Sequence, residues 1–449
     1  MPAKSMTEGA PWKHILSFSL PVMAGSLLQQ LYNTVDTVIV GRFAGEAALS
    51  AVGTTGSFAF LFLAIAIGLS SGNGVVVAWH FGAGNREEVR ANAATGILFL
   101  MILGVVCAFA GYFSAYPAYK YLINVPESFL DQTLIYFRIY AIGLLFQFGY
   151  NIFSAILRAV GDSAATLYFL LISSILNIAL DLLFVASFQW GVAGAAIATD
   201  ISQAASFVAA YIYMRRKHPI FRYRLREYRW NTKMVGRTVN VGFPISLQLI
   251  LVSVGFSLIQ RAVNGFGQAM TASFTVGQRV EMYLNLPCNA LQTTLATYTG
   301  QNIGAGKLHR IKQGVRHTFI LSFLMTALIS SLVYSFAGPI TGFFGLSDQA
   351  AEYCYSHVQA VALINIILCL YLPLFGVFQG SGHSGFPAVV ATGALGVRLI
   401  TTYLFRYSSF MGYKVIWLNG FYGLSVGFLI TWTIYLSKVW QKGIGEQST

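Results

Sequence analysis

Long apolar segments recur along the whole chain, and they limit the possible folds more than any other feature. About 20 apolar residues in a helix are enough to cross the hydrocarbon layer of a bilayer. Most of the runs are longer, so the helices should tilt or project beyond the lipid. The sequence therefore predicts an all-α integral membrane protein with twelve transmembrane helices, near 14–41, 48–80, 88–116, 128–158, 162–188, 191–216, 233–264, 268–301, 307–336, 348–380, 384–408 and 412–440.

Composition supports lipid as the solvent. The 449 residues are 56% hydrophobic and only 10% charged, whereas soluble domains carry about 25% charged residues. Four cysteines lie in or beside apolar runs without disulfide or metal-ligand spacing, and we interpret them as small buried hydrophobes (Cys107, Cys288, Cys354 and Cys369). The first 13 residues are short and polar and lack a small-residue cleavage site, so no cleaved signal peptide is expected.

The distribution of basic residues predicts the orientation. Segment 215–237 contains nine Lys/Arg and one acid, Glu227, and short loops rich in Lys/Arg stay in the cytoplasm. With six spans on each side, both termini should also be cytoplasmic, in a multi-pass protein of the inner (plasma) membrane. The basic segment 307–316 agrees with this. The net charge of +13 is then a topology signal, and no nucleic-acid partner is expected.

The second half of the chain repeats the first. "HFGAGNREEVR" (80–90) recurs as "NIGAGKLHRIK" (302–312), and "SLPVMAGSLLQQ" (19–30) matches "GFPISLQLILVS" (242–253). The near-constant shift predicts a duplicated six-helix unit. Since six is even, the two bundles should be related by a pseudo-twofold along the membrane normal. A site between such bundles suits alternating access in a transporter better than a channel or a receptor.

The expected organisation follows from this repeat. It comprises a cytoplasmic N-terminus (1–13), an N-terminal six-helix bundle (14–216), a basic cytoplasmic linker (217–232), a C-terminal six-helix bundle (233–440) and a cytoplasmic tail (441–449). Four prolines interrupt the spans and are candidate kinks or hinges: Pro21 and Pro244 at equivalent repeat positions, and Pro287 and Pro373 deep in spans 8 and 10.

Four of the fifteen acids fall well inside spans, namely Asp36, Asp181, Asp200 and Glu281. An ionisable group inside a bilayer costs several kcal/mol, so each is a functional candidate. Asp36 lies in "LYNTVDTVIVG" (31–41), a stretch without Lys or Arg. Gln29, Asn33 and Asp36 share one face of span 1 by their spacing, next to Tyr32.

Counting residues from the outer span ends, at roughly 1.5 Å each, places Asp36, Asp181 and Thr199 at similar depth. Asn177 precedes Asp181 by four residues on the same span. Such an oxygen-only set suits a hard cation or a shared proton, so Asp36, Asn177, Asp181 and Thr199 form a candidate site for Na⁺ or H⁺. The alternative is a satisfied buried network that only holds helices together. Helical Thr often bonds its own backbone, and Asp200 fits a rim or a helix-contact role.

The second bundle carries different chemistry. Asp36 maps to Ile259 or Gln260, Asn177 to Arg398 and Asp181 to Thr402. The deep residues of this bundle are instead Glu281, with Gln278 and Asn285 on roughly the same face, and Arg398 in span 11. A buried cation needs a partner, which makes a Glu281–Arg398 interaction a hypothesis. A free Glu281 would attract a cationic substrate, whereas a paired one would be structural.

These stretches resemble a known family. "QQLYNTVDTVIVGRFAGEAALSAVG" (29–53), "LRAVGDS" (157–163), "LNIALDLLF" (176–184) and "GVRLITTYLF" (396–405) are similar to the multidrug and toxic compound extrusion (MATE) transporters, in particular the bacterial branch with an acidic site in the N-terminal bundle. The resemblance covers essentially the whole chain. It implies an antiporter that exports amphipathic, often cationic, drugs or toxic metabolites in exchange for Na⁺ or H⁺.

The resemblance also implies that residues matching Asp36, Asn177, Asp181 and Thr199 bind the coupling ion. One departure is Leu182, where a proline often follows the span-5 aspartate.

The rival function is a lipid-linked precursor flippase of the same superfamily, which would usually have extra spans and a strongly cationic cavity. An enzyme is not expected, because no nucleophile–base pair, phosphate loop or metal set is present in the sequence. The expected partners are small-molecule substrates and membrane lipid, the expected state is a monomer, and no cofactor is expected besides the coupling ion.

Overall fold

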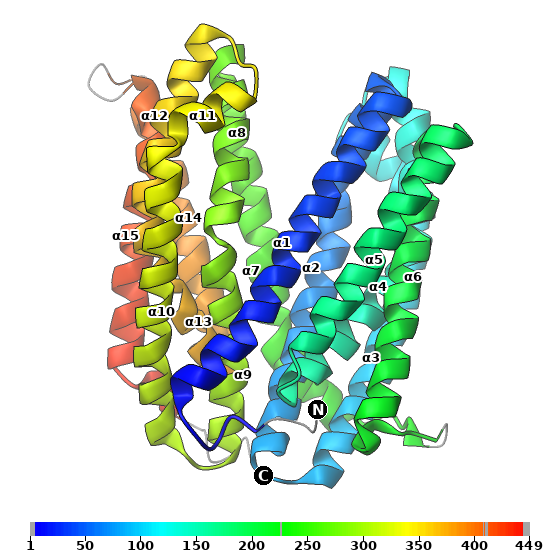
Figure 1. Ribbon diagram of the computed structural model, residues 1–449, viewed down its shortest axis with the longest axis vertical. Helices are drawn as coiled ribbons and strands as arrows, with labels where there is room; N and C mark the ends of the chain where they lie inside the picture. Colours follow the sequence, from blue (N-terminus) through cyan, green and yellow to red (C-terminus); the bar gives the residue numbers. More distant parts are fainter. Residues whose placement is uncertain (1–4, 225–226, 407, 409–411, 443–449) are drawn as a thin grey trace. The chain divides into compact units, whose positions relative to one another are not determined.

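The computed structural model describes residues 5–224, 227–406, 408 and 412–442, and all regular structure in these ranges is helical (Figure 1). The predicted all-α fold is thus confirmed. The long helices are α1 (Pro11–Phe43), α2 (Glu46–Gly82), α3 (Arg86–Pro117), α4 (Glu127–Ala159), α5 (Ala164–Asp181), α6 (Gly191–Lys217), α7 (Thr232–Asn264), α8 (Gln268–Leu284), α9 (Leu286–Gly304), α10 (Leu308–Ser335), α12 (Asp348–Cys369), α14 (Gly385–Phe405) and α15 (Val415–Leu436). Shorter elements are η1 (Ala118–Leu122), η2 (Leu182–Ser187), η3 (Pro219–Phe221), α11 (Ala337–Phe343), α13 (Leu372–Gly380), η5 (Gly412–Lys414) and η6 (Val439–Gln441).

Within the described residues, ten helical segments are long and apolar enough to cross a membrane. The two other expected spans correspond to α1 and to the pair α8–α9. Span 8 is broken at Asn285, which leaves α8 with 17 residues. Pro287 at the start of α9 explains this break, because proline lacks an N–H and clashes with the preceding turn. Span 10 is broken in the same way between α12 and α13, before Pro373.

Contacts along the chain define two compact units. Unit 1 is built around Ala24–Ser246, and unit 2 joins Met6–Met23 to the chain from Leu247 onward. Helices α1 and α7 therefore each contribute to both units. The boundary between the two units lies just after Pro21 in α1 and just after Pro244 in α7, at equivalent positions of the repeat.

The core of unit 1 is a continuous aromatic and aliphatic cluster between α2, α3 and α4. Phe137 is at its centre and contacts Phe58 and Tyr119, with ring centroids 5.2 Å apart in both cases. Gly72 of α2 allows α7 to approach closely, since a Cβ there would meet the backbone nitrogen of Gly242 at 2.5 Å. Such small-residue contacts are the usual means by which membrane helices pack tightly.

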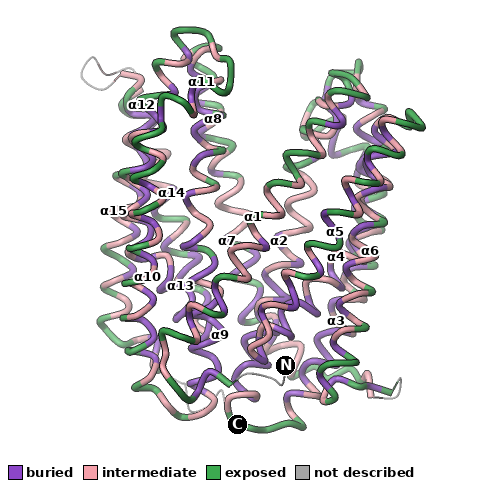
Figure 2. Tube along the Cα trace, viewed as in Figure 1, coloured by how far each residue is buried: buried purple, intermediate pink, exposed green. Residues whose placement is uncertain are grey.

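The core of unit 2 surrounds α9 and α13, which are buried along most of their length (Figure 2). Gly376 of α13 lies against α9, where a Cβ would come within 2.2 Å of the carbonyl oxygen of Gln292. The four cysteines are free thiols, and all are buried, as the sequence predicts.

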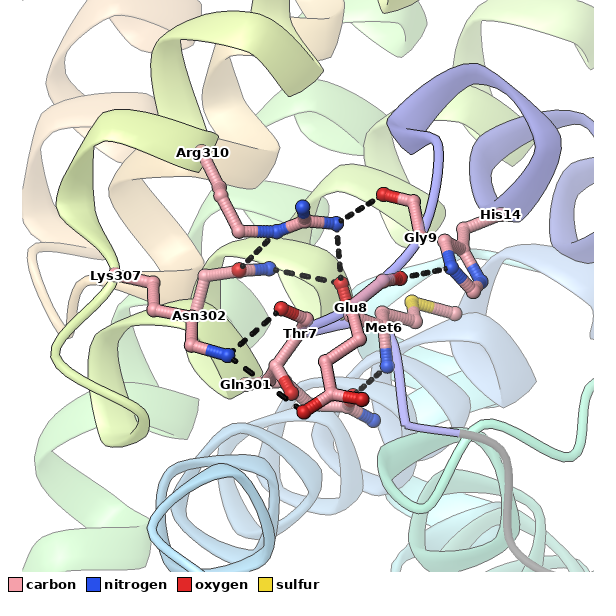
Figure 3. Close-up of polar contacts among 9 residues, drawn as sticks. All are labelled: Met6, Thr7, Glu8, Gly9, His14, Gln301, Asn302, Lys307 and Arg310. Atoms are coloured by element: carbon pink, nitrogen blue, oxygen red, sulfur yellow. Dashed lines mark hydrogen bonds and ion pairs between the residues drawn. The ribbon is translucent and has the colours of Figure 1, made fainter.

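The segment that precedes α1 is fastened to the α9–α10 turn within unit 2 (Figure 3). The Met6 N–H donates to Gln301 Oε1 at 2.8 Å, and the Asn302 side chain donates to the Met6 carbonyl at 3.4 Å. Arg310 donates to the carbonyls of Met6 and Gly9 at 3.3 and 2.9 Å. The start of α1 is thereby held at the Leu308 end of α10.

The segment between α6 and α7 is held within unit 1 in a comparable way. The guanidinium of Arg90, near the start of α3, donates to the carbonyls of Ile220 and Arg222 at 2.8 and 2.7 Å. It also forms an ion pair with Glu227 at 2.8 Å. The backbone at Ile220 and Arg222 and the Glu227 side chain are therefore held against the start of α3.

Candidate functional site: a carboxyl pair in unit 1

Two carboxyl groups meet inside unit 1. Asp36 lies on α1, and Asp181 is the last residue of α5 and is fully buried. The two carboxyl groups are direct neighbours. Among the described residues, neither Asp181 oxygen nor Asp36 Oδ1 has a hydrogen-bond partner. Two ionised carboxylates can only accept and would repel, so this contact needs a shared proton or a cation between them.

Asn177 lies one turn before Asp181 on the same helix. Its side chain is buried, and neither Oδ1 nor Nδ2 has a hydrogen-bond partner in the described part of the chain. A buried amide without partners is costly. Its carbonyl oxygen is therefore available as a further ligand on the α5 face that carries Asp181.

Thr199 is on α6, which packs along α5. Its hydroxyl donates to the carbonyl of Ala195 at 3.0 Å, which is the backbone bond that the sequence left open as an alternative. The oxygen keeps its lone pairs and can still accept or ligate. The structure thus brings Asp36 and Asp181 into contact and leaves Thr199 on a neighbouring helix without a direct bond to either.

The backbone changes its helix type directly after Asp181. Residues Leu182–Ser187 form η2, a π-helical segment. The chain therefore widens its turn here without a proline break. Single π-helical turns inside membrane helices are frequent at functional sites.

Two tyrosines of α4 complete the surroundings of the pair, and sequence reasoning missed both. Tyr136 is buried close to Asp36 and Asp181, and Tyr140 is a near neighbour of Tyr136. The Tyr140 hydroxyl donates to Gln147 Oε1 at 3.1 Å, so Tyr136 is the phenol of this helix that lies beside the two carboxyl groups. The spacing of four residues on an apolar helix was the available signal, but aromatic pairs of this kind are also common in packing.

Three polar residues of α1 that the sequence singled out lie beside Asp36. The Tyr32 hydroxyl lies close to Asp36 and beside the Gln29 side chain. Asn33 is exposed on the same helix. Gln29 and Tyr32 therefore belong to the polar surroundings of the pair, whereas Asn33 points away from protein contacts in unit 1.

Asp200 has a separate place. Its carboxyl lies against the Gly143 backbone of α4. A Cβ at Gly143 would approach Asp200 Oδ1 to 1.9 Å. Asp200 is thus a contact between α4 and α6, the second of the two roles that the sequence left open.

Unit 2 contains its own polar cluster. Glu281 Oε1 lies 3.9 Å from Arg398 Nη1, so the interaction that the sequence raised as a hypothesis is present. Arg398 also donates through Nε to Asn419 Oδ1 at 3.0 Å and lies over the ring of Phe256 at 5.0 Å. The Arg398 guanidinium therefore has three partners: a carboxylate, an amide oxygen and an aromatic ring.

A cavity of about 20 Å³ adjoins this pair, lined by residues that include His357, Asn365 and Trp417. A space of this size holds about one water molecule. The buried ring of His357 stacks between Phe274 and Trp417, with centroid distances of 5.5 and 4.4 Å. Sequence reasoning missed His357, although it is a histidine inside an apolar span.

The two other residues named with this cluster lie on or next to α8. Gln278 is half-buried on the helix, and Asn285 occupies the break before α9 with a buried Oδ1 that has no hydrogen-bond partner in the described ranges. Neither has a side-chain bond to Glu281 among the described contacts.

Comparisons with known proteins agree with the internal repeat. The MatE family profile matches the chain twice, over residues 21–183 and again over residues 244–404. The chain is 29% identical to a probable multidrug resistance protein, YoeA, of Bacillus subtilis, covering 96% of this chain and 94% of that protein. It is 23% identical to an FAD transporter of Shewanella oneidensis, covering 80% and 79%.

A solved structure has the same fold. It is described as the outward-facing conformation of a multidrug resistance MATE family transporter, and it superposes with a TM-score of 0.90 over 98% of both chains at 22% identity. Together with the double family match, which covers well over half of the residues, this shows that the chain has the MATE fold and belongs to the MatE family of transporters.

Proposed function

We propose that the protein is a secondary antiporter that exports amphipathic, often cationic, drugs or toxic metabolites in exchange for Na⁺ or H⁺. The observation that carries this proposal is the close approach of Asp36 and Asp181, two membrane-embedded carboxyl groups with buried oxygens that have no hydrogen-bond partner among the described residues. Ionised, the pair attracts a small cation. With a proton or Na⁺ bound, it is close to neutral.

The coupling follows from this change of charge. Uptake of the ion lets α1 and α5 pack closely through Asp36 and Asp181, with Asn177 and Thr199 as further oxygen ligands. Loss of the ion restores the repulsion and the attraction for a cationic substrate. Ion and substrate then have opposite effects on one two-state equilibrium, which is what exchange by alternating access requires.

The second cluster has a supporting role in this proposal. Because Arg398 pairs with Glu281, Glu281 is not a free anionic attractant for a cationic substrate. Gln278, Asn285 and Arg398 are therefore candidates for substrate contact or coupling rather than for ion binding, together with Gln29, Tyr32 and Asn33 in unit 1.

The proposed setting is the inner (plasma) membrane, with both termini in the cytoplasm. The basic residues before α7 and at the start of α10 support this orientation. A monomer is sufficient, because both six-helix repeats are present in one chain. Small-molecule substrates and lipid are the proposed partners, with no nucleic acid and no cofactor other than Na⁺ or H⁺.

The test uses the purified protein in sealed vesicles preloaded with ethidium. Efflux is measured with an inward Na⁺ gradient alone and then with an inward pH gradient alone, each at zero membrane potential. Acceleration by one of the two gradients supports the proposal and identifies the ion. Identical efflux with and without either gradient would reject ion-coupled antiport.

A further inference from the structure

An apolar groove in unit 2 is separate from both polar clusters. It has a volume of about 490 Å³ and lies between α8, α10 and α11, lined by residues that include Tyr283, Val333, Phe336, Ile340 and Phe343. Pockets of a few hundred Å³ are large enough for a drug-sized or lipid-sized group. All lining residues are apolar or aromatic except one, Arg279 of α8.

The groove opens at one end of the unit. Helix α10 runs from Leu308, beside the fastened segment before α1, to Ser335, where α11 follows. The groove therefore lies at the end of α10 opposite to that segment (Figure 1). Around α11, Tyr334, Phe336 and Phe343 are exposed, Phe343 to 86%. Exposed aromatic rings at helix ends are typical of the membrane–water interface.

Arg279 is the unusual member of this lining. Its side chain is exposed, and it has no hydrogen-bond or ion-pair partner among the described residues. An exposed arginine beside an apolar groove is best stabilised when an anion pairs with it. The described part of the chain places no acid there, so the anion has to come from outside the protein.

We propose that this groove is a binding site for an anionic phospholipid, with one acyl chain against α10 and α11 and the headgroup phosphate paired with Arg279. The apolar walls match an acyl chain, and the single guanidinium matches a phosphate at the interface. In the proposed orientation, the lipid belongs to the outer leaflet. The site is independent of the coupling ion and of the transported substrate.

The test uses trace amounts of photoactivatable lipids with a diazirine in the acyl chain. The full chain is reconstituted in phosphatidylcholine vesicles with photoactivatable phosphatidylglycerol or, in a parallel sample, photoactivatable phosphatidylcholine. After irradiation, label on peptides from α8, α10 and α11 is quantified by mass spectrometry. The expected excess of phosphatidylglycerol over phosphatidylcholine label is about fivefold, which corresponds to about 1 kcal/mol per basic residue near an anionic lipid.

Three variants make the result specific. Arg279→Gln should reduce the ratio to about one, and Arg279→Glu should favour phosphatidylcholine. Arg316→Gln, which removes an exposed arginine nearer the other end of α10, should leave the ratio unchanged. Equal labelling by both lipids in the unmodified protein, or an unchanged ratio in Arg279→Gln, would overturn the proposal. Loss of the label on adding ethidium would assign the groove to substrate instead and would also overturn it.

Discussion

Replacing Asp181 by asparagine distinguishes two hypotheses for the carboxyl pair. If the pair is an ion-binding site, the substitution should raise the free energy of unfolding, and if it is a network that only holds helices together, the substitution should lower it. Both Asp181 oxygens are buried without a hydrogen-bond partner among the described residues, and the Asp36 carboxyl is their neighbour. Leaving a buried polar group unsatisfied costs about 1–3 kcal/mol. Asparagine keeps the shape, removes the charge and can donate to Asp36. We therefore expect Asp181→Asn to raise the free energy of unfolding of the ion-free protein.

The size of the effect can be measured as a melting temperature. A gain of 1 kcal/mol shifts Tm by about 2–4 °C in domains of 150–250 residues, so we expect a rise of a few degrees by intrinsic fluorescence in detergent without Na⁺ at neutral pH. The same variant should lose ion binding. Two charges about 4 Å apart interact by about 4 kcal/mol at an effective dielectric constant of 20, and a loss of only 1.4 kcal/mol already weakens binding about tenfold.

The assay compares Tm with and without the coupling ion. In the unmodified protein the ion should raise Tm. In Asp181→Asn, Tm without the ion should be higher than in the unmodified protein, and adding the ion should not raise it further. Asp131→Asn, at an exposed position near the start of α4, is the matched control and should change neither quantity. A lower Tm of Asp181→Asn together with an intact ion-dependent increment would refute the functional reading and favour a structural network.

Three further substitutions test the surrounding structure by chemical or thermal unfolding. Gly143→Ala should destabilise the protein by about 1–3 kcal/mol, because the added methyl group would overlap the Asp200 carboxyl. Arg398→Gln should cost about 3–5 kcal/mol by leaving Glu281 without its cation, whereas adding Glu281→Gln should recover much of the loss. Asp162→Asn should cost about 1.5–3 kcal/mol at neutral pH, since hydrogen bonds to a charged group are lost.

The third substitution also predicts a pH dependence. Burial raises the pKa of the Asp162 carboxyl, but hydrogen bonds from His218, Tyr213 and the Ala165 N–H outweigh it and hold this pKa below its ordinary value. The stabilisation is therefore complete above the unfolded pKa of about 3.9 and is lost as pH falls through the folded pKa. The difference in unfolding free energy between the unmodified protein and Asp162→Asn should shrink below about pH 4. A constant difference down to pH 3 would contradict the hydrogen-bonded carboxylate.

Controls distinguish these effects from general damage. Gly236→Ala, in α7 where an added Cβ meets nothing within 4 Å, should be neutral or stabilising by up to about 1 kcal/mol. If it destabilised as much as Gly143→Ala, overlap with Asp200 would not be the cause. For the charged pair, strict additivity of Glu281→Gln and Arg398→Gln would show that the two side chains do not interact.

Most of the fold could be predicted from the sequence, because apolar length and internal repetition are properties of consecutive residues. The helix breaks at Pro287 and Pro373 could also be predicted, because a proline inside an apolar span is a local feature of the sequence. The division of α1 and α7 between the two units could not be predicted, because no local sequence feature shows which neighbouring helices a helix contacts. Its position just after Pro21 and Pro244 could be recognised only in the structure.

The candidate site was predictable in part. Depth counting placed Asp36 and Asp181 at one level, and the structure brings their carboxyl groups together. The π-helical turn after Asp181 was not predictable, because Leu182 is compatible with an ordinary α-helix. Tyr136 and His357 were missed because an aromatic or histidine side chain inside an apolar span gives the same pattern whether it packs or functions.

The central claim is that the Asp36–Asp181 pair couples the ion to export. The most direct measurement is ethidium efflux from vesicles that contain Asp36→Asn, driven first by the ethidium gradient alone and then with the coupling-ion gradient added. We expect efflux down the ethidium gradient to remain measurable and the ion gradient to give no acceleration. Acceleration equal to that of the unmodified protein would contradict the claim.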